Sequence, residues 1–429
     1  METRKTEDCI TPMADPTSPA APRRAALVFI FITILLDILA MGMIIPVLPK
    51  LVVNFLGGDT VRAAEMFGLF STAWALMQFI FSPVLGALSD RFGRRPVILL
   101  SNFGLGFDYI LMALAPSLGW LFAGRVISGI TSASISTASA YIADVTPPEK
   151  RAASYGLLGA AFGIGFVLGP ALGGVLGTVS PHLPFWVAAG LSLANALYGL
   201  FVLPESLPPE RRKAFAWRRA NPVGALALLR SKPDVLGLAG VHFLYQLSHV
   251  VLPSVFVLYG SHRYGWDERA VGLTLACTGV FSLIVQGGLV RPIVKRLGER
   301  NTLLLGLGAG AVGFAIYGLA STGALFWIGI PVMSLWGLFG PASQGLMSSR
   351  MGPSEQGQLQ GALSSLMGIA GMIGPALFTQ LFALGIDPER NWNLPGAPFL
   401  FSTLLLVFAG LLASRVTAPR TEVVPAPNP

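Results

Sequence analysis

The sequence predicts an all-α membrane protein with twelve transmembrane helices arranged as two six-helix halves. Of its 429 residues, 53% are hydrophobic and only 12% are charged, about half the roughly 25% typical of soluble proteins. Apolar segments recur with lengths close to the roughly 20 residues that cross a hydrocarbon core about 30 Å thick. The expected spans are residues 25–48, 64–88, 97–116, 118–142, 153–178, 184–203, 235–259, 270–293, 302–321, 324–348, 358–384 and 397–414.

These segments are expected to be helices, because lipid offers the backbone no water partners and the segments lack the alternation of barrel strands. The first run is too long for a cleaved signal peptide, contains Asp37 and follows a polar, Pro-rich tail. The expected organisation is a disordered tail at 1–22, halves at 23–203 and 235–415, a linker at 204–234 and a second tail at 416–429.

Lys and Arg are unevenly divided between alternate loops, and this predicts the orientation. With the N-terminus inside, the inside loops contain 17 Lys and Arg residues, whereas the outside loops and helix ends contain five. Cytoplasmic loops are enriched in these residues. Both termini and the linker are therefore expected in the cytoplasm, and the net charge of +8 indicates membrane topology rather than a nucleic-acid partner.

An offset of 205 residues superposes Gly and Pro positions of the two halves. The pairs are Gly93 with Gly298, Pro148 with Pro353, Gly156 with Gly361, Gly163 with Gly368, Gly169 with Gly374 and Pro170 with Pro375. Parallel six-span repeats are typical of transporters, which bind substrate near the midplane between the repeats. A receptor or an intramembrane enzyme has no physical need for this duplication, so we expect a transporter and not an enzyme.

Several motifs then resemble a known family. Residues 86–96, GALSDRFGRRP, resemble the signature between helices two and three of the major facilitator superfamily, and residues 163–174, GIGFVLGPALGG, resemble the helix-five signature of its proton-coupled drug antiporters. Stretches similar to the tetracycline efflux branch are 36–37, 46–49, 108–109, 112–113, 141–144, 341–345 and 355–361. The resemblance runs from about residue 27 to 412 and implies proton-driven drug export.

The first signature is interpreted as a cytoplasmic latch. Its members are Gly86, Asp90, Arg91, Gly93, Arg94, Arg95 and, from the end of the fourth span, Asp144. The glycines allow close turns, and Asp90 and Arg94 can form charge-assisted bonds across helix ends. The resemblance implies that the acid takes part in conformational switching and that its Arg pairs with Asp144. Alternatively, the three Arg residues only fix the membrane topology. In the second half Lys295 occupies the position equivalent to Asp90, so the latch is expected to be asymmetric.

The second signature places Gly165, Gly169 and Gly173 four residues apart, a spacing that lets helix backbones approach closely. Pro170 adds a bend or a weak point in the hydrogen-bond ladder. Helix packing alone explains this pattern as well as a role in coupling does.

Three charged residues within spans are candidates for proton coupling, because charge in a membrane is costly. Asp37, Asp108 and Arg125 are expected at comparable depth. Desolvation favours the neutral form of an acid and a nearby Arg favours the ionised form, so movement of Arg125 would load and release a proton. The alternative is a static ion pair that fixes helix packing.

Uncharged polar residues within spans are candidates for the substrate cavity. They are Gln78, His242, Gln246, His249, Gln286 and Gln344. His242, Gln246 and His249 share one helix face by their spacing. Interhelical hydrogen bonding explains each of them equally well. No third ligand lies at a useful spacing for metal binding by the histidines, so no metal site is expected.

The chain departs from the tetracycline efflux pattern in two places. That family has an acid in the middle of helix nine, and the corresponding stretch 307–314 has none; Ser282 stands where the family often has a His. These absences argue against a metal-chelated tetracycline carried with the same proton stoichiometry, and they do not affect the prediction of a transporter.

The sequence is thus interpreted as a monomeric inner-membrane transporter of a bacterium. We expect it to export a small amphipathic, tetracycline-like drug in exchange for protons, without a cofactor, and with a divalent cation only if one accompanies the substrate. The alternatives are a proton-linked transporter of a metabolite, such as a sugar, an amino acid or a siderophore-like compound, and a transporter-like sensor without flux. No Walker loop is present, so ATP is not expected to drive transport.

Overall fold

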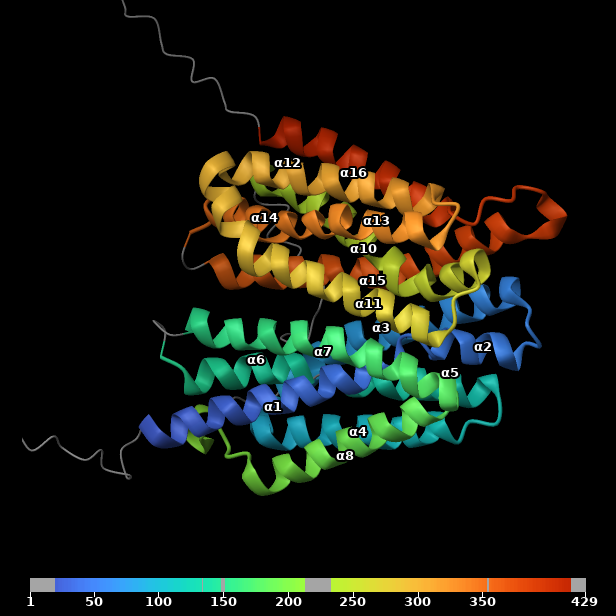
Figure 1. Ribbon diagram of the computed structural model, residues 1–429. Coiled ribbons are helices and arrows are strands. Elements are labelled where there is room, and N and C mark those ends of the chain that lie inside the picture. The colour runs from blue at the N-terminus through green and yellow to red at the C-terminus, as the bar shows by residue number, and fades with distance from the viewer. Residues whose placement is uncertain (1–19, 133, 148–150, 213–232, 353–354, 418–429) are drawn as a thin grey trace, which may run out of the picture.

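The computed structural model describes residues 20–132, 134–147, 151–212, 233–352 and 355–417. Within these ranges all regular structure is helical. The helices form two bundles that lie side by side (Figure 1). The predicted tails, except residues 20–22 and 416–417, and linker residues 213–232 lie outside the described residues.

The N-terminal bundle contains six spans, two of which are broken into shorter helices. Its elements are α1 (Ala20–Ile44) with α2 (Leu48–Phe55), α3 (Thr60–Phe92), α4 (Arg94–Ala113), α5 (Leu118–Thr131) with α6 (Ser134–Val145), α7 (Arg151–Val179) and α8 (Leu183–Val202).

The C-terminal bundle repeats this plan with its own irregular turns. Its elements are α10 (Pro233–Tyr264), α11 (Glu268–Ile284) with the π-helical turn η3 (Val285–Leu289), α12 (Val290–Leu319), α13 (Gly323–Ser334) with the 3-10 turn η4 (Leu335–Leu338) and α14 (Phe339–Ser348), α15 (Gln356–Ile386) and α16 (Ala397–Val416).

The prediction of twelve spans is confirmed. Eleven stretches of the described chain are long and apolar enough to cross a membrane, and one of them, Glu268–Leu319, is 52 residues long. That stretch contains two spans, because Gly298 has φ 74° and ψ 167° and breaks the helix between them. The first helix begins at Ala20, earlier than the predicted start at residue 25.

The two breaks at Gly93 and Gly298 confirm the internal repeat. Gly93, between α3 and α4, has φ 107° and ψ 161°, close to the backbone of Gly298. This region of conformational space is essentially restricted to glycine. The paired Pro170 and Pro375 likewise both lie inside helices, α7 and α15.

Several spans start at the end of the molecule opposite the chain termini, and their first turns are capped by side chains. Asp59 accepts from the backbone N–H of Arg62 at 3.0 Å, and Asp267 accepts from that of Ala270 at 2.8 Å. Such residues satisfy N–H groups that have no partner inside the helix. These local signals help to fix the starts of α3 and α11, two of the helices at the seam between the halves.

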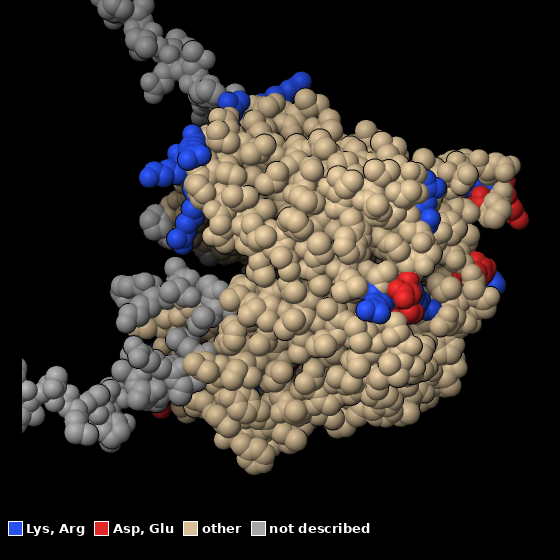
Figure 2. Space-filling model, viewed as in Figure 1, with Lys and Arg blue, Asp and Glu red and all other residues tan. Residues whose placement is uncertain are grey.

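The halves meet along two pairs of helices, α3 with α15 and α7 with α11. A Cβ on Gly68 would overlap the Thr379 side chain, and a Cβ on Gly174 would lie 3.1 Å from Cα of Gly272. The largest buried apolar cluster contains residues of both halves. Figure 2 shows the molecule hollowed between the halves at the end where α1 begins and α16 ends, hereafter the termini end.

Candidate transport site and latch

Asp37 lies in the middle of α1, 6% exposed, within a network of amides. The Asn195 Nδ2 group of α8 donates to Asp37 Oδ1 at 2.9 Å and to the Thr33 carbonyl at 2.9 Å. Asn102 of α4 completes the network when its side-chain amide is oriented so that both polar atoms have partners. Its nitrogen then donates to Asp37 Oδ2 at 3.2 Å, and its oxygen accepts from Asn195 Nδ2 at 3.1 Å. Sequence reasoning missed both amides, although each is a polar side chain within an apolar span.

Asp108 lies on the same helix as Asn102, six residues further along, and is 1% exposed. Neither of its carboxyl oxygens has a hydrogen-bond partner among the described residues. A Cβ on Gly124 would lie 2.9 Å from Asp108 Oδ1, so the absence of a side chain there lets the carboxyl group approach α5. Burying a carboxyl group without a partner is costly, so Asp108 is a candidate functional residue.

Arg125, on α5, is the cation near Asp108. The two side chains interact electrostatically, and Arg125 Nη2 donates to Ser128 Oγ at 2.9 Å. The guanidinium carbon lies 5.7 Å from the Trp74 ring centroid, and Nε has no partner among the described residues. The structure thus places Asp37, Asp108 and Arg125 in one half, on α1, α4 and α5 respectively.

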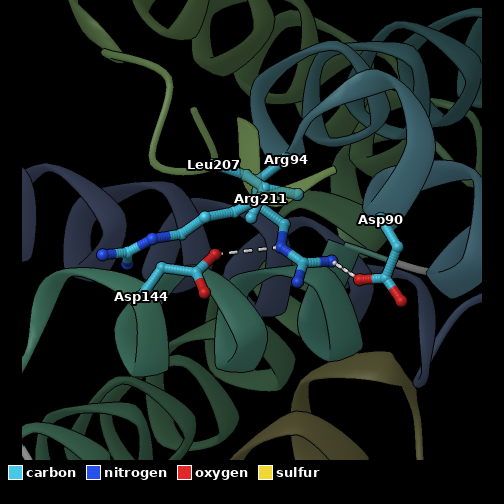
Figure 3. Close-up of a pocket in the computed structure, with 5 residues that line it drawn as sticks. All are labelled: Asp90, Arg94, Asp144, Leu207 and Arg211. Carbon is cyan, nitrogen blue, oxygen red and sulfur yellow. Dashed lines mark hydrogen bonds and ion pairs between the residues drawn. The ribbon is translucent and has the colours of Figure 1, made fainter. Parts of the chain in front are cut away.

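The predicted latch residue Arg94 lies between two carboxylates at the termini end (Figure 3). Its Nη1 is 2.6 Å from Asp90 Oδ1 and its Nε is 3.0 Å from Asp144 Oδ2. Nη1 also donates to Ser89 Oγ at 2.6 Å. Charge-assisted bonds of this length are among the stronger polar contacts in proteins, so Arg94 joins the ends of α3 and α6 to the start of α4.

The other predicted latch residues have different surroundings. Arg95 Nη2 donates to the Leu200 carbonyl near the end of α8 at 2.5 Å. Arg91 is exposed and lies over the Phe92 ring at 5.0 Å. At Gly86 an added Cβ would meet nothing within 4 Å. Arg91 and Gly86 therefore lie outside the ion-paired group.

The start of the linker packs on the latch, a contact that sequence reasoning missed. Glu205 accepts from the backbone N–H groups of Arg94 at 2.8 Å and Arg95 at 3.3 Å, which caps the N-terminus of α4. Ser206 Oγ donates to Asp144 Oδ2 at 3.2 Å. A polar pocket of about 260 Å³ lies here, lined by Asp90, Arg94, Asp144, Leu207 and Arg211.

The C-terminal half has a different arrangement at the equivalent positions. Lys295 is exposed. Glu299 is the repeat equivalent of Arg94. Its carboxylate lies against Gly345 of α14, where an added Cβ would overlap it. Arg300 Nη2 donates to the Ser414 carbonyl near the end of α16 at 3.4 Å, as Arg95 does to α8. The repeat therefore conserves the contact of the second basic residue with a helix C-terminus, but not the paired carboxylates.

The glycines of the second signature pack α7 against α1. A Cβ on Gly165 would lie 2.8 Å from Ile38 Cγ2, one on Gly169 would lie 2.9 Å from Gly42 Cα, and one on Gly173 would overlap Met43. Pro170 lies inside α7 beside them, and its carbonyl faces Gly272 of the other half. This geometry agrees with the packing interpretation.

The predicted cavity residues are distributed over both halves. His249 and Gln286 are exposed, and Gln78, His242, Gln246 and Gln344 are half-buried. Gln286 lies on the π-helical turn η3, an irregularity often found at functional sites. Among the described residues no three His, Cys, Asp or Glu side chains are grouped to hold a metal ion.

Twelve spans in two parallel repeats, with a seam between them and buried acids in one half, define a secondary transporter. The Major Facilitator Superfamily model matches residues 30–375 and, in a second match, 292–428. The chain belongs to the Major Facilitator Superfamily.

Particular relatives share most of the chain. The chain is 40% identical to the class C tetracycline resistance protein of Escherichia coli over 371 residues, 86% of this chain and 91% of that protein. It is 36% identical to the class B protein of Escherichia coli over 395 residues, 90% of this chain and 96% of that one. Among solved structures, the human organic anion transporter MFSD10 superposes with a TM-score of 0.69 at 25% identity, covering 91% of this chain and 99% of that chain.

Proposed function

We propose that the chain is a proton-coupled exporter of a small amphipathic drug, with tetracycline as the first candidate, and that it works by alternating access. The observation that carries the proposal is Asp108, a carboxyl group that is 1% exposed, has no hydrogen-bond partner among the described residues and lies near Arg125. Such a group gains or loses a proton as its cation withdraws or approaches. The relatives that are tetracycline resistance proteins support the direction of transport and the substrate.

The proposed cycle uses the two ends of the molecule in turn. The halves touch at the end opposite the termini, where Lys50 and Glu268 form an ion pair. In Figure 2 the charges visible at the termini end of the C-terminal half are Lys and Arg, whereas both signs are visible at the opposite end. By the positive-inside rule the termini end faces the cytoplasmic side of a bacterial inner membrane. Because the molecule is hollowed between the halves at that end, this conformation receives the drug from the cytoplasm.

The remaining parts of the proposal follow from the same cycle. A monomer contains both halves and the buried acids, so it is sufficient for transport. Proton flow supplies the energy for export, so the cycle needs neither an enzyme activity nor a cofactor. A divalent cation enters only as a companion of the substrate.

The test is tetracycline susceptibility of an efflux-deficient bacterial strain that expresses the chain, with and without a protonophore. Wild-type protein is expected to confer resistance that the protonophore and Asp37→Asn or Asp108→Asn abolish. Asp59→Asn, which changes an exposed acid and retains a helix-capping side chain, is the matched control. Absence of resistance from well-inserted wild-type protein would overturn the choice of tetracycline and leave a metabolite as the substrate.

A further inference from the structure

Five aromatic rings of α10, η4 and α14 form a cluster in the C-terminal half. Tyr245 and Phe339 stack with centroids 4.0 Å apart and an interplanar angle of 17°. Trp336 lies 4.7 Å from Tyr245 and 5.3 Å from His249, and His242 lies 6.1 Å from Phe339. Three members come from α10 and two from η4 and the start of α14. We call these five residues the ring cluster.

His249 is the accessible member of the ring cluster. Trp336 is 5% exposed and Phe339 is 0% exposed, whereas His249 is exposed although it lies in the middle of α10. Helix α10 contacts α14, α15 and α16 of its own half and α2 and α3 of the other half. His249 lies on the side of α10 that contacts Trp336, and α10 also contacts helices of the other half, so we infer that the accessible side of His249 faces the interior between the halves and not the lipid.

Two helix irregularities meet beside His249 and Trp336. The 3-10 turn η4 contains Trp336 and contacts the π-helical turn η3. A Cβ on Gly337 would lie 3.7 Å from Cγ of Gln286, so the exposed Gln286 side chain adjoins the backbone next to Trp336. Interrupted helices at the midplane are where transporters of several folds bind their substrates. The exposed Gln286 amide thus adjoins the segment that carries Trp336, the ring in contact with His249.

Glycines of α12 hold the ring cluster in place from behind. A Cβ on Gly306 would lie 2.8 Å from the backbone nitrogen of Phe339, and one on Gly310 would lie 2.6 Å from Trp336 Cδ1. Residues 307–314, which contain no acid, form part of this packing face. The space that a longer side chain at Gly310 would need is therefore filled by the Trp336 indole.

We propose that the ring cluster is a binding subsite for the flat, conjugated ring system of the substrate, with His249 as the contacting ring. Gln286 hydrogen-bonds the polar edge of the same ligand, and Trp336 and Gly310 are positioning residues. Between their ends the spans of this half contain no Asp, Glu, Lys or Arg, so recognition here depends on ring faces and neutral hydrogen bonds. Aromatic rings at such distances attract one another beyond the area they bury. The inference rests on the proposed transport function, whose substrate it narrows.

The test measures equilibrium binding to the purified full chain in nanodiscs with two planar fluorescent probes, tetracycline and ethidium. His249→Ala is expected to weaken binding of a planar probe by about tenfold, and His249→Phe by less than about threefold, because a ring face remains. Gly310→Ala is expected to weaken binding, whereas Gly308→Ala is not, because a Cβ on Gly308 would meet nothing within 4 Å.

A double variant separates positioning from a general loss of structure. Gly310→Ala should have no further effect in the His249→Ala background if it acts through the ring cluster. Unchanged affinity in His249→Ala, equal losses in His249→Ala and His249→Phe, or additive losses in the double variant would each overturn the inference.

The outcomes also distinguish the two proposals. Wild-type binding of ethidium but not tetracycline would remove tetracycline from the proposed function, and the same variants would then test the subsite with ethidium. Wild-type binding of neither probe would overturn the planar subsite, while proton-driven export of a non-planar compound would still stand.

Discussion

Lys50 Nζ lies 3.5 Å from Glu268 Oε2 and donates to the Trp266 carbonyl at 2.8 Å. Lys50 belongs to α2 of the N-terminal half and Glu268 begins α11 of the C-terminal half. The contact therefore joins the halves at the end opposite the termini. In an alternating-access cycle it must break each time that end opens.

Lys50→Met is expected to shift the population toward the conformation open at that end. The pair is partly exposed, so its loss should change the equilibrium by about 0.5–1 kcal/mol, a factor of roughly two to five. Distances between spin labels placed on the two halves measure the populations. Arg390→Met is the matched control, because its 3.4 Å ion pair with Asp387 lies within one half. Equal populations in wild type and Lys50→Met would contradict a gating role.

The two buried acids are expected to differ in their effects on stability. In Asp37→Asn the side-chain oxygen can still accept from Asn195 Nδ2, but an NH2 group replaces the oxygen that accepts from Asn102, and the loss of that hydrogen bond should cost about 1 kcal/mol of unfolding free energy. Asp108→Asn breaks no hydrogen bond among the described residues, because neither Asp108 oxygen has a partner there. Its thermal stability in detergent should therefore match or exceed that of wild type. A larger loss in Asp108→Asn than in Asp37→Asn would contradict this account.

Proton coupling is expected to be lost in Asp108→Asn while exchange survives. The amide cannot carry a proton in exchange, but it leaves the fold and the seam intact. In proteoliposomes, drug-driven proton movement should disappear, whereas exchange of labelled for unlabelled drug across the membrane should continue. If imposed proton gradients still drive uphill transport by the variant, Asp108 is not a coupling residue.

Glu205→Ala is expected to destabilise the N-terminal half. The carboxylate accepts from two N–H groups at the start of α4, and loss of such a cap costs about 0.5–2 kcal/mol. Thermal unfolding of the purified protein measures the effect. Glu210→Ala, a change at an exposed residue of the same segment, should leave the unfolding temperature unchanged. Equal stability of the two variants would show that the cap is energetically unimportant.

Gly93→Ala is expected to be more harmful than Gly298→Ala. Both positions have positive φ, which costs a non-glycine residue about 1–3 kcal/mol. A Cβ on Gly93 would also overlap the Glu205 carboxylate, whereas one on Gly298 would meet nothing within 4 Å. Unfolding temperature and expression level of the two variants should therefore differ. Identical losses would assign the whole effect to backbone strain.

The fold was largely predictable because membrane spans leave strong signals. Apolar length gave the spans, and the constant offset between Gly93 and Gly298 gave the repeat, which the backbone angles of both glycines confirm. The breaks inside spans were not predictable. The π-helical turn at Gln286 contacts η4, and no local pattern in the sequence indicates it.

The candidate site was predictable only residue by residue. Charge within apolar spans selects Asp37 and Asp108, but not the amide of Asn195, which reaches Asp37 from a helix 158 residues away. Glu205 follows a proline in a polar segment, where an acidic residue is ordinarily solvated. Its role depends on how α8 ends beside α4, a tertiary relationship that periodicity does not determine.

The unequal division of charge between the halves has a consequence for biogenesis. A charged residue at the centre of a span raises the apparent cost of insertion by about 2.5–3.5 kcal/mol, and Asp37, Asp108 and Arg125 all belong to the half that the ribosome makes first. Asn195 lies in the last span of that half. The first span therefore acquires this partner for its acid only after five further spans have been synthesised, so early insertion intermediates expose a carboxyl group that the finished protein conceals.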